Sequence, residues 1–167
     1  MGTLARRRST RLALCVIAVI SSACSSEVPK DSRCRNLVYK EDGLSRSEYL
    51  PCAGEIVAAL DELRGQSEAA ARGDRRARAD GETTLSRVNA LMKAAGGRNL
   101  LELEDRPLRS LNMRISNAVT SYTAFYMVRI LEEPNQFAAQ SRRAAAAELS
   151  AATRNHEEAL GSYRRLQ

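Results

Sequence analysis

Apolar residues recur at intervals of three and four along most of the chain beyond residue 47, which is the spacing of one face of an α-helix. The pattern predicts four helices, with Ser47 as the N-cap of the first and Pro134 between the third and the fourth. These helices are expected to cover about residues 48–71, 82–95, 106–132 and 135–165. Strand-like alternation does not compete with this pattern. The predicted fold class is therefore all-α, a small antiparallel three- to four-helix bundle.

The third predicted helix has the most continuous apolar stripe, so we expect it to be the central helix of the bundle. Its stripe consists of Leu108, Leu111, Ile115, Val119, Tyr122, Tyr126 and Ile130. No charged residue occurs in the sequence from Ile115 to Val128. Beside the stripe lies a seam of uncharged polar residues at intervals of three or four: Asn112, Ser116, Thr120 and Thr123. The seam is either a partner-binding surface or a strip that the first and fourth helices cover.

The segment between the first two predicted helices, Arg72 to Glu82, contains four arginines and three acidic residues. We interpret it as a solvated turn at the tip of a helical hairpin. Two alternatives stay open. Arginine and alanine are good helix formers, so one helix can run straight through, with Gly73 and Gly81 as weak points. The arginines can also form a site for anionic lipid heads or cell-wall polymer.

The N-terminus has the layout of a secretory signal peptide. Its positive region consists of Arg6, Arg7, Arg8 and Arg11. An apolar run from Leu12 to Ile20 follows, and then the small residues Ser21, Ser22 and Ala23. A membrane-spanning helix needs about 20 apolar residues, and the uncharged run here is too short and ends in serines.

The same stretch resembles the lipobox of bacterial lipoproteins, in which small residues precede a cysteine. Ser22 and Ala23 fit the two positions before Cys24, whereas Ser21 departs from the leucine usual at the third. The resemblance implies cleavage before Cys24 and attachment of lipid to it. Ser25, in place of aspartate, implies sorting to the outer membrane. The alternative is ordinary secretory cleavage, which leaves Cys24 as a free thiol.

The expected organisation thus has three parts: a lipoprotein signal peptide (1–23), a segment with the lipid anchor, flexible tether and disulfide-pinned cap (24–46), and a helical domain (47–167). The expected location is the bacterial cell envelope, lipid-anchored and facing the periplasm. The formal charge is +6, and removal of the four arginines of residues 1–23, which hold no acid, leaves +2. A nucleic-acid binder would concentrate positive charge on one face, so no nucleic-acid partner is expected.

Cys15 is expected to be removed with the signal peptide, and Cys24 is the expected site of lipid attachment. Two cysteines, Cys34 and Cys52, then remain in the domain. An oxidising compartment favours a disulfide between them, worth about 3 kcal/mol in the chain-entropy model. Metal ligation and redox activity are the weaker alternatives, because close ligand partners and a C-x-x-C motif are both missing from the sequence.

Candidate chemistry is sparse. His156, the only histidine, stands beside Glu157 and Glu158 and is expected at the surface. We predict no catalytic residue, metal site or cofactor. We do predict attachment to the membrane through the lipid anchor. The favoured function is a non-enzymatic module that binds another protein or itself, or serves envelope structure. One alternative is an enzyme acting on cell wall or lipid, with an acid/base pair formed across helices. The other is a carrier whose apolar cavity is lined by Tyr122, Phe125, Tyr126 and Phe137.

Overall fold

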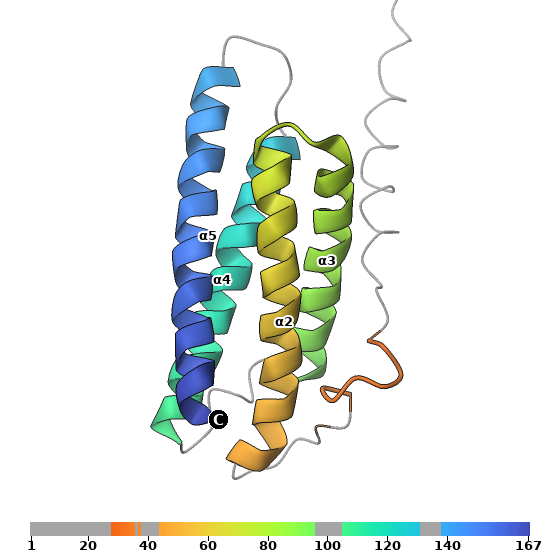
Figure 1. Cartoon of the computed structure of the whole chain (residues 1–167), viewed down its shortest axis with the longest axis vertical. Helices are drawn as coiled ribbons and strands as arrows, with labels where there is room; N and C mark the ends of the chain where they lie inside the picture. Colours follow the sequence, from red (N-terminus) through yellow and green to blue (C-terminus); the bar gives the residue numbers. More distant parts are fainter. Residues whose placement is uncertain (1–27, 36, 38–43, 96–104, 131–137) are drawn as a thin grey trace, which may run out of the picture.

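The computed structural model describes residues 28–35, 37, 44–95, 105–130 and 138–167 (Figure 1). Within these ranges the chain forms four helices, α2 (Arg46–Ala71), α3 (Arg75–Ala94), α4 (Arg106–Ile130) and α5 (Ala138–Leu166). Helices that follow one another in the chain run antiparallel, so that α2 and α3 form one hairpin and α4 and α5 the other (Figure 1). The predicted all-α bundle is confirmed.

The two hairpins pack side by side around one core. Among the described helices, α2 and α4 each contact all three others, whereas α3 and α5 do not contact each other. The core is formed by apolar side chains from all four helices, and its largest fully buried members are Tyr49, Tyr122, Phe125, Ile56, Leu60, Leu63, Leu91, Leu108, Leu111 and Ile115. The central position expected for the third helix is therefore shared with α2.

The start of α2 differs from the prediction by two residues. Ser45, not Ser47, is the N-cap, and the backbone N–H of Ser45 donates to the carboxylate of Glu48 at 3.0 Å. The physical reason is the capping box, in which a serine is followed three residues later by glutamate. Ser45 has a glutamate at that distance and Ser47 does not.

The hairpin turn predicted within residues 72–82 is present, but it is shorter than expected. The turn is confined to Arg72–Asp74, and α3 already begins at Arg75. Gly73 adopts φ +101°, which favours glycine and stops α2. The carboxylate of Asp74 then caps α3 by accepting the N–H groups of Arg76 at 2.9 Å and Ala77 at 3.0 Å. The glycine and the cap together exclude a continuous helix.

Gly81 therefore lies inside α3, where the structure gives it a packing role. A Cβ at this position would overlap the hydroxyl of Tyr126 on α4. That hydroxyl lies 3.1 Å from Oγ of Ser67 on α2. The missing side chain thus lets α3 approach the Tyr126–Ser67 hydrogen bond in the core.

Candidate functional site

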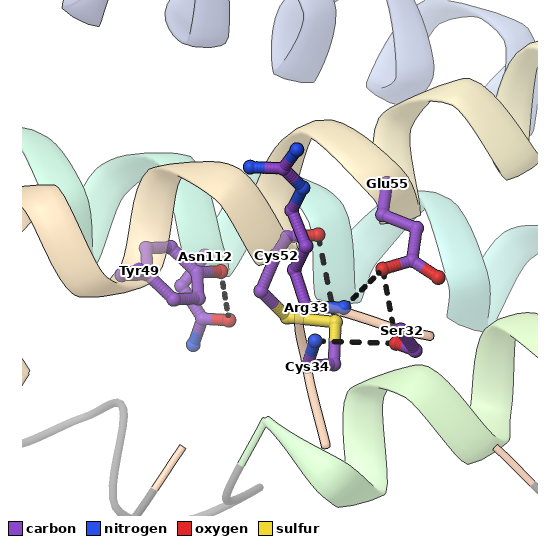
Figure 2. Close-up of a disulfide and its surroundings, with 7 residues drawn as sticks. All are labelled: Ser32, Arg33, Cys34, Tyr49, Cys52, Glu55 and Asn112. Carbon is purple, nitrogen blue, oxygen red and sulfur yellow. Dashed lines mark hydrogen bonds between the residues drawn. A yellow bond between two sulfur atoms is a disulfide. The ribbon is translucent and has the colours of Figure 1, made fainter. Parts of the chain in front are cut away.

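A disulfide joins Cys34 to Cys52 of α2, and both residues are fully buried (Figure 2). The turn around Cys34 is also held by the carboxylate of Glu55. One oxygen of Glu55 accepts the hydroxyl of Ser32 at 2.9 Å and the backbone N–H of Arg33 at 3.0 Å. The flexible tether predicted within residues 24–46 does not extend to Ser32 and Arg33, because both are hydrogen-bonded to Glu55 of α2.

The predicted seam divides into a buried end and an outer part. Asn112 is buried, and its Oδ1 accepts the hydroxyl of Tyr49 on α2 at 3.1 Å (Figure 2). Burial raises the pKa of the Tyr49 hydroxyl, so it stays protonated and donates to the amide. Asn112 therefore belongs to the α2–α4 packing and does not face a partner.

The rest of the seam points away from the core. Thr120 is exposed, whereas Ser116 and Thr123 are half-buried. The hydroxyl of Thr120 donates to the carbonyl of Ser116 at 2.9 Å, and that of Thr123 donates to the carbonyl of Val119 at 2.8 Å. Since both hydroxyls already donate within the helix, neither requires a partner to satisfy its hydrogen.

Two large apolar side chains frame this outer part. Met113 is 56% exposed and Met127 is 60% exposed, and they are the exposed large hydrophobic residues of the described chain. We define the α4 outer face as Met113, Ser116, Asn117, Thr120, Thr123, Ala124 and Met127. All of its members are uncharged. The sequence predicted the polar strip but missed the methionines, which the 3.6-residue period places on the same side of the helix.

His156 contradicts its predicted surface position, because it is fully buried between α5 and α2. Its Nε2 lies 3.3 Å from Oδ1 of Asp61 on α2. Burial lowers the pKa of His156 below its ordinary value of 6.5, and the charge of Asp61 opposes this. The available signal was spacing, since His156 follows the buried Ala152 by four residues and precedes the buried Ala159 by three. The imidazole is therefore enclosed by the packing of α5 on α2.

The aromatic residues proposed for an apolar cavity are packed into the core. Tyr122, Phe125 and Tyr126 are each at most 2% exposed. The rings of Phe125 and Tyr126 meet edge to face, with centroids 5.0 Å apart. Phe137 lies outside the described residues. The three described aromatics thus act as core side chains and do not line a pocket.

Shallow grooves cross the described surface, and two of them contain carboxylates. One, of about 510 Å³, lies between the Cys34 turn, α2 and α3, and includes Glu55 and Glu62. Both carboxylates are engaged, Glu55 by the turn and Glu62 by Arg87, whose hydrogen bond lowers the pKa of Glu62. The other groove, of about 650 Å³, lies between α2 and α5, and its carboxylates belong to Glu68 and Glu157. Neither pair is buried, so neither groove has the environment that sets up an acid/base pair.

Within the described ranges, no cluster of three or more histidine, cysteine or carboxylate side chains is placed to hold a metal ion. In the same parts of the chain, every helix is too short or too polar to cross a bilayer. Comparison with known proteins gives no relative. No family model matches the chain, and neither a curated protein nor a solved structure does.

Proposed function

We propose that this protein is a non-enzymatic lipoprotein of the bacterial cell envelope whose helical bundle binds a protein partner through the α4 outer face. It is anchored by lipid on Cys24, faces the periplasm and, by the serine at position 25, is sorted to the outer membrane. The observation that carries the proposal is the α4 outer face itself, an uncharged strip that ends in two exposed methionines. An opposing surface can pack on such a strip without burying an unpaired charge, which would be costly.

Comparison with α3 supports the choice of this face. The exposed side of α3, for comparison, carries Arg75, Arg76, Asp80 and Glu82. Charged side chains of this kind are depleted from the centres of protein interfaces, where methionine is enriched. Methionine also adapts its shape to an opposing surface because it is unbranched and flexible. The α4 outer face therefore shares two features of protein-binding surfaces, the lack of charge and the exposed methionines.

The fastening of the N-terminal segment supports the anchored part of the proposal. Cys24 and Ser32 are eight residues apart, a stretch that spans at most about 28 Å. Since the chain is bonded to α2 from Ser32, a lipid on Cys24 would hold the bundle close to the membrane. A protein held in this way meets membrane-bound partners at a raised effective concentration.

The test uses the full chain, with an affinity tag after Gln167, expressed in the envelope of a bacterial host. Intact mass and membrane fractionation report the anchor, and Cys24→Ala should move the protein from the membrane fraction to the soluble one. A photo-crosslinking residue at Met113 should yield a discrete protein adduct, whereas the same residue at the exposed Asp80 of α3 should yield none. Equal labelling from both positions, or an unchanged membrane fraction in Cys24→Ala, would overturn the corresponding half of the proposal.

A further inference from the structure

The residues of the α4 outer face are arranged symmetrically around Thr120. Met113 and Met127 lie seven residues before and after it, and Ser116 and Ala124 lie four before and after. Seven residues are nearly two helical turns and four are slightly more than one, so all five positions fall along one line of the helix. The line therefore reads similarly in both directions, with small side chains at its centre and methionine at each end.

Such a line is self-complementary in an antiparallel helix pair with a twofold axis at Thr120. Each residue then faces the residue equally far beyond the axis, so Met113 of one copy meets Met127 of the other. Ser116 meets Ala124 in the same way, and Thr120 meets itself. The small central residues permit helix axes about 8–10 Å apart, and the methionines close the two ends of the contact.

Charge favours a second copy in the antiparallel orientation. The face has no charge, so two copies can approach without like charges meeting across it. The nearest exposed charge in line with it is Arg109, eleven residues before Thr120. Antiparallel docking places the two Arg109 positions about 33 Å apart along the pair, well beyond the Debye length, whereas parallel docking places them side by side.

We propose that the partner of the α4 outer face is a second copy of this chain, docked antiparallel about a twofold axis at Thr120. The inference rests on the proposed function, since it names the partner of the same face. One helix pair of this length buries well under the ~800 Å² per partner of a standard interface. The dimer is accordingly weak in dilute solution and is populated where a shared membrane concentrates the chains.

Cysteine crosslinking in membranes tests the geometry. In the full chain, Thr120→Cys should form a disulfide with itself under mild oxidation, since the axis brings the two positions within disulfide reach. The yield should exceed that of the exposed control Asp80→Cys on the order of tenfold or more, with the 120–120 peptide identified by mass spectrometry. Co-expressed Met113→Cys and Met127→Cys chains, carrying different tags, should crosslink to each other more than either does to itself.

A structural control accompanies the crosslinks. Thr120→Arg places a charge on the twofold axis of an exposed position, so it should keep the helical circular dichroism of the parent and abolish the 113–127 crosslink. A crosslink that survives Thr120→Arg, or 113–113 and 127–127 products in place of 113–127, would overturn the proposed dimer.

The same samples separate this inference from the proposed function. If the protein is membrane-bound but its 120–120 disulfide yield is no higher than that of the Asp80→Cys control, the dimer is refuted and the anchored module is unaffected. Capture of a different protein at Met113, without a 120–120 product, has the same consequence. If the protein is found in the soluble fraction and still forms the 120–120 disulfide, the lipid anchor is refuted and the dimer is supported.

Discussion

Replacement of Tyr49 by phenylalanine tests whether Asn112 belongs to the core. The substitution removes the hydroxyl that donates to Oδ1 of Asn112 and leaves the ring in place. Tyr49 is fully buried and Asn112 is 4% exposed, so water cannot replace the lost donor without disturbing the α2–α4 contact. The variant therefore leaves a buried amide oxygen without its partner.

The magnitude follows from that unpaired oxygen. A buried polar group deprived of its partner costs about 1–3 kcal/mol, which raises the unfolding equilibrium constant roughly 5- to 150-fold. Replacement of both partners by apolar groups is nearly neutral by comparison. The double variant Tyr49→Phe/Asn112→Leu should therefore recover most of the stability that Tyr49→Phe loses.

Urea denaturation followed by far-ultraviolet circular dichroism, with the disulfide intact, measures these differences as free energies of unfolding. Thr120→Val is the matched control on the same helix, because Thr120 is exposed, and it should change stability by less than about 0.5 kcal/mol. The single variant Asn112→Leu completes the comparison. If Tyr49→Phe costs no more than the Thr120→Val control, or if the double variant loses as much stability as Tyr49→Phe and Asn112→Leu together, Asn112 is not held by Tyr49.

Three further predictions concern stability. Joint replacement of Cys34 and Cys52 by alanine should lower the free energy of unfolding in urea by about 3 kcal/mol, and an unchanged value would argue against the disulfide. Alanine at Gly65, which meets open space, should stabilise the protein by about 1 kcal/mol, whereas alanine at Gly81 meets a buried tyrosine hydroxyl and should cost about 1–3 kcal/mol; shifts of the same sign would contradict that close approach. Because burial lowers the folded-state pKa of His156, the unfolded state takes up the proton first, so stability should be level above about pH 6.5 and fall below it. His156→Gln should flatten the pH profile of the denaturation midpoint between about pH 6.5 and 5, and a profile unchanged by the substitution would rule out this residue as its source.

Helix ends depended on local signals that the sequence contains. The spacing of apolar residues placed the four helices, and it erred mainly at the start of α3. The glutamate three residues after Ser45 and the glycine before Asp74 are both visible in the sequence, and each marks the helix start that the structure has. The starts of α2 and α3 were misplaced because the prediction relied on the spacing of apolar residues more than on the residues that cap helices.

The candidate face was only partly predictable. The spacing of uncharged polar residues along the third predicted helix correctly placed Thr120 on the α4 outer face. It also included Asn112, which is buried because it pairs with Tyr49, 63 residues away in the chain. His156 was assigned to the surface because charged neighbours adjoin it, and its burial depends on which side of α5 meets α2. The alanine-rich sequence of α5 gives that side little apolar contrast.

Local patterns in the sequence were enough to predict a helical chain, the approximate position of each helix and the pairing of Cys34 with Cys52. The helices follow from local spacing, whereas the cysteine pairing was predicted on the expectation that Cys15 and Cys24 are not available as partners. Tertiary structure decided that the Cys34 turn is fastened by Glu55, that Asn112 and His156 face the interior, and that the methionines of α4 stay exposed. The physical reason is that periodicity defines a face of a helix, whereas the packing of distant segments decides whether that face is covered.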